Sequence, residues 1–204
     1  MRDGSKYAGM FEEGEIMGPG TRTYDDGTEY VGDFVKGEKH GYGEISYGRR
    51  NAREEYYKGN WNMNVRQGFG QLLLRNGTIY KGSFVNNQPS GDCQIIFPDQ
   101  ATYSGEVARG VMHGIGELKL SNGFGFAGKF EQGKRHGTGR FYIQNGTYSL
   151  EGQFENDEAT LKANKVLFDL ISPIIEDEVV ADPKAKKDPK AVKKDSPFTE
   201  EEEA

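Results

Sequence analysis

Aromatic and small side chains alternate with side chains that tolerate solvent along most of this 204-residue chain. In residues 30–34, Tyr-Val-Gly-Asp-Phe, the two rings and the glycine fall on one face of an extended strand. Residues 41–45, Gly-Tyr-Gly-Glu-Ile, alternate in the same way. A period of two is typical of a β-strand, so these two segments predict the strands of one β-hairpin.

The hairpin unit recurs at a nearly constant interval. An aromatic-x-Gly-x-apolar motif starts at Tyr7, Tyr30, Tyr57, Tyr80, Tyr103 and Phe126, with a degraded copy at Leu150. The successive starts are 23, 27, 23, 23, 23 and 24 residues apart. Two glycines follow each of the first six starts, at the eleventh and thirteenth residue after it, except that Cys93 takes the second position in the fourth unit. Such a period predicts a solenoid, in which each unit contacts only its neighbours.

Glycine at fixed places inside strands needs a packing reason, because glycine weakens a strand. We expect the ring of each repeat-starting residue to lie over a glycine of the adjacent strand, where a Cβ atom would collide with it. The stacked rings would then form one stripe that serves as the core. The stripe contains Tyr7, Phe11, Tyr30, Phe34, Tyr57, Trp61, Tyr80, Phe84, Tyr103, Phe126 and Phe130.

The turn residues complete the prediction of the fold. Asp26-Gly27, Asn76-Gly77, Asn122-Gly123 and Asn145-Gly146 stand between units, and such dipeptides accept the positive φ of tight hairpin turns. We therefore predict an all-β fold: an elongated, single-layer antiparallel sheet of stacked hairpins over residues 1–157. A short amphipathic C-terminal helix or cap is expected within 158–181 and an extended, low-complexity charged tail over 182–204.

Residues 30–43 and 126–139 carry the fullest copies of the unit, in which Gly-Glu-Lys-His-Gly-Tyr-Gly or Gly-Lys-Arg-His-Gly-Thr-Gly follows the aromatic motif. They resemble the MORN repeat in spacing, aromatic residues and paired glycines, and the resemblance covers residues 7 to about 157. Departures from the pattern are a four-residue insertion near 49–55, Pro89, Cys93 and Leu150.

The family resemblance also implies a function. MORN repeats occur as scaffolds in axonemal radial spokes and other cytoskeletal assemblies, in junctional membrane proteins, and beside catalytic domains of lipid kinases and a histone methyltransferase. This chain looks most like the stand-alone axonemal members. The resemblance implies a non-catalytic structural subunit of a ciliary or flagellar axonemal complex, such as a radial spoke or the central apparatus.

The composition bears on the architecture and on the classes of function that are expected. Glycine accounts for 29 residues and the hydrophobic set for only 34%, which favours a thin, repetitive architecture. The net charge is −6, of which residues 1–157 contribute −2 and residues 158–204 contribute −4. Nucleic-acid binding is not expected, because it needs a surplus of clustered cations.

The single cysteine and the absence of long apolar runs bear on location. Cys93 alone can form neither an intramolecular disulfide nor a cysteine-built metal site. No stretch approaches the roughly 18 consecutive apolar residues of a spanning helix, and residues 1–10 lack the apolar region of a signal peptide. We expect a cytoplasmic or cytoskeletal location, in the axoneme of a cilium or flagellum if the resemblance holds.

Two motifs that suggest chemistry have simpler explanations. His40, His113 and His136 all precede the first glycine of a pair, so a periodic turn position accounts for them and no metal site is predicted. Residues 123–128 fit a dinucleotide-binding GxGxxG pattern, but that motif requires a following helix, whereas a hairpin strand is predicted here. No nucleophile or carboxylate pair emerges either, so we predict no catalytic activity, no cofactor and no small-molecule substrate.

Protein subunits of a large assembly are the expected partners, and a membrane phospholipid is the alternative. The residues predicted to contact a partner are the rings Tyr30, Phe34, Tyr57, Trp61, Tyr80, Phe84, Tyr103, Phe126 and Phe130. The alternative function is that of a peripheral membrane tether that binds anionic phospholipids, since each cation near an acidic surface contributes about 1 kcal/mol. Its candidate contacts are Lys36, Lys39, Arg49, Arg50, Lys134 and Arg135.

The C-terminal segment has a helical period. Apolar residues fall on one face of a predicted helix, and Pro173 would end or kink it. This face could cap the open end of the sheet or dock on a partner, and the two roles can coexist. The predicted docking residues are Ala163, Val166, Leu167, Leu170, Ile171 and Ile174.

Overall fold

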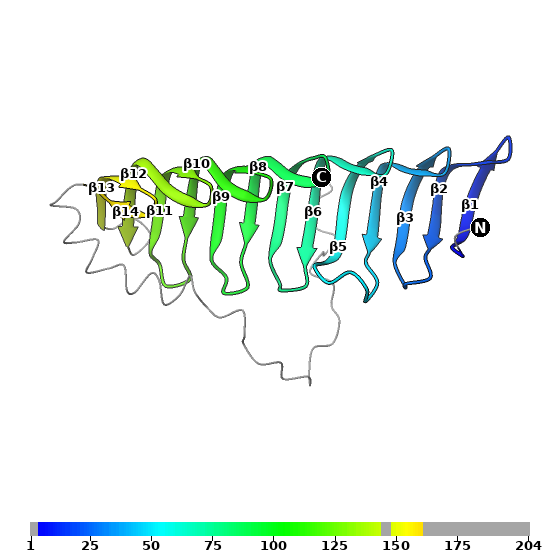
Figure 1. The fold of residues 1–204 in the computed structure, drawn as a ribbon, viewed down its shortest axis with the longest axis horizontal. Coiled ribbons are helices and arrows are strands. Elements are labelled where there is room, and N and C mark those ends of the chain that lie inside the picture. Colours follow the sequence, from blue (N-terminus) through cyan, green and yellow to red (C-terminus); the bar gives the residue numbers. More distant parts are fainter. Residues whose placement is uncertain (1–3, 144–147, 161–204) are drawn as a thin grey trace, which may run out of the picture.

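The computed structural model describes residues 4–143 and 148–160. Their 14 strands form one open antiparallel sheet in which every strand pairs with its neighbours in sequence (Figure 1). The strands are β1 Lys6–Glu12, β2 Glu15–Thr23, β3 Glu29–Val35, β4 Glu38–Ser46, β5 Glu54–Asn62, β6 Val65–Leu74, β7 Ile79–Val85, β8 Gln88–Ile96, β9 Thr102–Ala108, β10 Val111–Lys119, β11 Gly125–Glu131, β12 Lys134–Ile143, β13 Tyr148–Glu155 and β14 Glu158–Ala159. The predicted all-β, single-sheet fold is confirmed, and the described residues contain no helix.

Two-residue turns close the hairpins at one long edge of the sheet. In the turn between β3 and β4, Lys36 has φ 50° and Gly37 has φ 78°, the pair of positive values that suits the twist of hairpin strands. Each turn after the first is also bonded to the preceding repeat: the Gly37 N–H donates to the carbonyl oxygen of Ile16 at 2.9 Å. The turns therefore help to stack the hairpins.

The connections between hairpins lie at the other long edge and have a different geometry (Figure 1). Gly27 has φ 82°, whereas Asp26 keeps a negative φ. The Asp26 carboxylate instead accepts a hydrogen bond from the Thr28 N–H at 2.9 Å. Only the glycine of the predicted Asp-Gly turn needs the left-handed conformation, and the acidic side chain fixes the loop.

The paired glycines have two separate structural roles. Gly41, the first of its pair, has φ 61° and lies where the register between β3 and β4 shifts. Gly43, the second, faces the end of the Tyr30 ring, and a Cβ atom there would overlap the tyrosine hydroxyl. The predicted packing of a ring over a glycine is thus confirmed for the second glycine, whereas the first is required by the backbone conformation of the bulge.

Rings of adjacent repeats stack edge to face along one side of the sheet, called the ring face below. Tyr30 contacts Phe34 of its own repeat and Trp61 of the next, with centroid distances of 5.0 and 5.5 Å. Such pairs contribute about 0.5–1.5 kcal/mol each beyond the area they bury. The same contact between repeats recurs for Tyr7 with Phe34, Tyr57 with Phe84, Tyr103 with Phe130 and Phe126 with Phe154.

The ladder of rings is interrupted in the fourth repeat. Cys93 fills the glycine position opposite Gly82 and is buried. The Tyr80 hydroxyl donates to the carbonyl oxygen of Gly110 at 3.1 Å, whereas the Tyr30 hydroxyl donates to that of Asp33, three residues on. The core accordingly consists of two clusters, and Tyr80 packs against both.

We expect the protein to lose stability at alkaline pH. Burial raises the pKa of Tyr103 to about 12 and also raises that of Tyr30. Stability from these groups is fully present below pH 10 and is lost as the pH rises toward the folded-state pKa, by up to about 1.4 kcal/mol per pH unit and tyrosine. Urea unfolding between pH 8 and 11.5 should show this decline. Tyr103→Phe should flatten it, because Phe126 already fills the same position in the sixth repeat; an equal slope in that variant would contradict the assignment.

Candidate interaction surfaces

The rings that the sequence assigned to partner binding are core residues, so this assignment is wrong for eight of the nine. Tyr30, Tyr57 and Tyr103 are 0% exposed. Phe34, Trp61, Phe84, Phe126 and Phe130 are also buried, and Tyr80 is partly buried. Each buried ring makes an edge-to-face contact with a ring of a neighbouring repeat. These residues hold the repeats together and leave contact with partners to other surfaces.

Cationic side chains cover part of the ring face. The Lys39 ammonium lies 5.8 Å from the centre of the Tyr30 ring and 5.3 Å from that of Trp61. Burial lowers the Lys39 pKa. The Arg66 guanidinium lies 5.3 Å from the Tyr57 ring, and these two cations occupy the same position in successive repeats. Cation–π contacts of this kind stabilise the packing and screen the rings from solvent.

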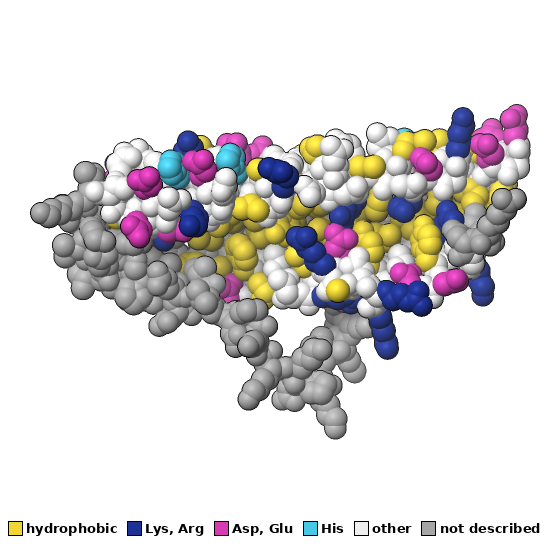
Figure 2. All heavy atoms as spheres, viewed as in Figure 1, with side chains coloured by type: hydrophobic (Ala, Val, Ile, Leu, Met, Phe, Trp, Pro, Cys, Tyr) yellow, Lys and Arg dark blue, Asp and Glu magenta, His cyan; other side chains and the backbone are white. Residues whose placement is uncertain are grey.

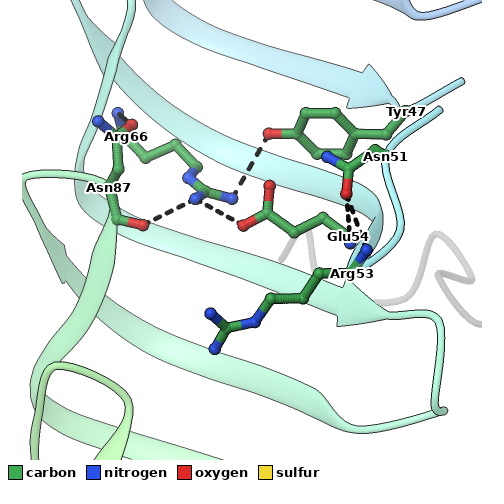
Figure 3. Close-up of polar contacts among 6 residues, drawn as sticks. All are labelled: Tyr47, Asn51, Arg53, Glu54, Arg66 and Asn87. Atoms are coloured by element: carbon green, nitrogen blue, oxygen red, sulfur yellow. Dashed lines mark hydrogen bonds and ion pairs between the residues drawn. The ribbon is translucent and has the colours of Figure 1, made fainter.

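Arg66 is the centre of a buried polar cluster (Figure 3). Its side chain is paired with the Glu54 carboxylate at 2.8 Å, and the two side chains are 8% and 20% exposed. The guanidinium also donates to the carbonyl oxygen of Asn87 at 2.8 Å and to the Tyr47 hydroxyl at 3.5 Å. Burial raises the pKa of Tyr47 to about 12, so Tyr47 remains a neutral partner. The cluster joins three successive repeats and is a structural feature.

The insertion in the second unit forms an ordered loop that carries several arginines. Arg75 donates from Nε to the carbonyl oxygen of Asn51 at 2.6 Å and from Nη2 to those of Tyr47 and Gly48 at 3.0 and 2.9 Å. Arg49, Arg50 and Arg53 are exposed, and in Figure 3 the Arg53 guanidinium points away from the Glu54 and Arg66 pair. The loop therefore presents cations at the edge opposite the hairpin turns.

The six basic residues considered for lipid binding do not form one patch. Lys36 and Lys134 lie at the hairpin-turn edge, whereas Arg49 and Arg50 lie in the β4–β5 connection at the other edge. Lys39 is largely buried against rings, and the Arg135 Nε is paired with the Asp157 carboxylate at 2.9 Å. Figure 2 shows Lys and Arg scattered over the viewed face and interspersed with Asp and Glu.

A row of exposed apolar residues lies on the face opposite the rings, called the outer face below. Tyr42 and Phe69, each between the two glycines of a pair, are 51% and 70% exposed, and Ile115 occupies the same position in the fifth repeat. We name these three residues the outer row. Strands two apart in a sheet are separated by about 10 Å, so Tyr42 on β4 and Phe69 on β6 are near neighbours. The sequence carried the signal, because the residue next to a ring-facing glycine on the same strand must point to the other face.

The histidine, GxGxxG and cysteine motifs are explained by the repeat. The backbone oxygens of His40 and His113 accept hydrogen bonds from Tyr30 and Tyr103 at 3.4 and 3.1 Å. Within residues 4–143 and 148–160, no group of three or more His, Cys, Asp or Glu side chains is placed to hold a metal ion. The strand β11, Gly125–Glu131, follows the turn at Gly123 where the GxGxxG motif would need a helix. Burial raises the pKa of Cys93 to about 11, so its thiol stays neutral.

The predicted docking residues of the C-terminal segment, Ala163, Val166, Leu167, Leu170, Ile171 and Ile174, lie outside the described residues. The array itself extends slightly past the predicted limit at residue 157, because β14 ends at Ala159. In the part of the chain that the structure describes, no helix is long and apolar enough to cross a membrane.

Comparison with known proteins identifies the repeat. Among solved structures, a similar one is the SAS-4 (dCPAP) TCP domain of Drosophila melanogaster, in complex with a proline-rich motif of Ana2 (dSTIL). It has a TM-score of 0.43 and 13% sequence identity, and the match covers 67% of this chain and 72% of that one. No curated protein matches the sequence. The MORN repeat matches at residues 7–29, 30–50, 57–79, 80–102, 103–124 and 126–148. These six matches span most of the described hairpins, and the chain therefore belongs to the MORN-repeat family.

Proposed function

We propose that this chain is a non-catalytic scaffold that binds other proteins through the outer face of its sheet. The observation that carries the proposal is the outer row, since Phe69 remains 70% exposed while Tyr30, Tyr57 and Tyr103 on the ring face are 0% exposed. Large exposed apolar side chains that line up on a rigid surface are typical of protein interaction sites. The regular sheet holds them at fixed spacing.

We further propose that the scaffold acts in a ciliary or flagellar axonemal complex. The resemblance of these repeats to those of axonemal MORN proteins supports this placement. Phospholipid binding is the weaker alternative, because Lys39 and Arg135 are engaged within the protein. The remaining cations lie on opposite edges of the sheet, which reduces their combined attraction to an acidic membrane surface.

Replacing the outer row tests the proposal in a ciliated cell. We expect the tagged wild-type chain to stay with the axoneme after detergent extraction and the Tyr42→Ser/Phe69→Ser variant to be released. Both side chains are exposed, so the melting temperature should barely change. Crosslinking mass spectrometry of the retained fraction would identify the contacted proteins.

Asp92→Ser is the matched control, because Asp92 occupies the same position in the fourth repeat with a polar side chain. Retention of the double variant at the wild-type level would rule out the outer row as the partner surface. Release of the wild-type chain together with the membrane fraction would instead favour the phospholipid alternative.

A further inference from the structure

Among the described strands, β1 pairs only with β2 and lies at one end of the row (Figure 1). Its Phe11 ring contacts Tyr7 of its own repeat at 5.3 Å. The equivalent Phe34 contacts two tyrosines, one from its own repeat and one from the repeat before it. Phe11 lacks the second contact and is 62% exposed, whereas Phe34 is 1% exposed. This edge is therefore missing one aromatic partner.

The sequence of β1 is complementary to itself in the antiparallel direction. In the strand Lys6–Glu12, Lys-Tyr-Ala-Gly-Met-Phe-Glu, Gly9 is the central residue. If two copies paired with Gly9 opposite Gly9, Tyr7 of each would face Phe11 of the other and Lys6 would face Glu12. Residues directly opposite in an antiparallel pair share a face of the sheet. The rings would thus meet on the ring face and the opposite charges on the outer face.

The same pairing rule already operates inside the protein. Where one repeat meets the next, a glycine lies opposite a glycine, as Gly20 opposite Gly32 and Gly43 opposite Gly59. These junctions have a continuous register without a bulge. A Gly9 to Gly9 contact would continue this line of facing glycines across the boundary between two copies.

We propose that two copies of this chain form a two-fold dimer through β1, with Gly9 at the axis and the sheet continuous across the interface. Each copy supplies the Tyr7 ring that the Phe11 of the other lacks. The Met10 side chain, which is 58% exposed in the single chain, would lie against Ala8 of the other copy on the outer face. Edge-to-edge pairing of this kind uses the unpaired backbone groups of an end strand. A single pair of seven-residue strands is a small interface, so the dimer is weak and forms at high protein concentration.

Charge reversal at the ends of β1 tests both the interface and its register. Lys6→Glu places like charges opposite each other at both ends, and Glu12→Lys does the same with cations. Each variant alone should weaken dimerisation by about tenfold or more. An equimolar mixture of the two variants should form a heterodimer about as strong as the wild-type dimer, because every facing pair is again of opposite charge. Sedimentation velocity measures the dissociation constants, and native mass spectrometry identifies the heterodimer.

Two further variants test whether a loss of dimer is specific to the β1 interface or follows from the removal of any exposed ring. Phe11→Ser should weaken the dimer, whereas Phe69→Ser, which removes a similarly exposed ring far from β1, should not. Unchanged melting temperatures would show that all the variants fold. The proposal is overturned if the wild-type chain remains monomeric up to about millimolar concentration. It is also overturned if the mixture of the two charge variants forms no heterodimer. Species that keep growing with concentration would indicate head-to-tail association through β1 and the other end of the sheet, and would also overturn it.

Discussion

Gly43→Val is expected to lower the free energy of unfolding by about 2 to 3 kcal/mol, which is in the upper range for overpacking a core. The added side chain would occupy the space of the Tyr30 hydroxyl and ring edge. Tyr30 is fully buried and contacts Phe34 and Trp61, so its displacement would disturb two repeats at once. Urea unfolding followed by circular dichroism measures the change.

Tyr42→Val is the control, because it places the same side chain on the same strand but on the exposed outer face. It should change the free energy of unfolding by less than about 0.5 kcal/mol. The fourth repeat shows how the fold tolerates a side chain in the glycine position: Cys93 fills it and Tyr80 bonds elsewhere. Equal stability of Gly43→Val and Tyr42→Val would show that the ring does not need the glycine.

Removing the partner of the buried arginine should have the second large effect. Glu54→Ala leaves the Arg66 guanidinium, whose residue is 6% exposed, without a counter-ion. Removing one partner of a buried ion pair typically costs about 3 to 5 kcal/mol. Arg66 would keep its hydrogen bonds to Asn87 and Tyr47, so we expect a cost at the lower end of this range. We therefore expect a loss of about 3 kcal/mol in the free energy of unfolding.

The exposed ion pair of Lys119 and Glu117, in which the lysine side chain is 57% exposed, is the control for the effect of burial. Lys119→Ala should cost less than about 1 kcal/mol, and added salt should reduce that cost further. The cost of Glu54→Ala should persist in 0.5 M salt. A double variant, Glu54→Leu/Arg66→Met, should recover part of the loss, since it leaves no charge buried. Similar small losses for Glu54→Ala and Lys119→Ala would contradict a buried, mutually dependent pair.

The repeat, the hairpins and the packing of rings over glycines were predictable from the sequence because they depend on short-range contacts. Tyr30 meets Gly43 within one hairpin, and each hairpin pairs with the next in sequence. In such a quasi-one-dimensional fold, a motif and its spacing define most of the contacts. The outer row could also have been found, since the position next to a ring-facing glycine on the same strand assigns its side chain to the other face.

Tertiary structure decided which surfaces are available. Alternation assigns Tyr57 to a face of the sheet but does not say whether that face is covered, and the covering groups, Phe84 and Arg66, come from elsewhere in the chain. The pairing of Glu54 with Arg66 and the hydrogen bond from Tyr80 to Gly110 likewise join separate strands. Sequence periodicity therefore determined the sheet and the direction of its side chains. The tertiary structure alone determined which side chains are buried and which charges are paired. Both depend on contacts with residues of other strands, which the pattern along one strand does not specify.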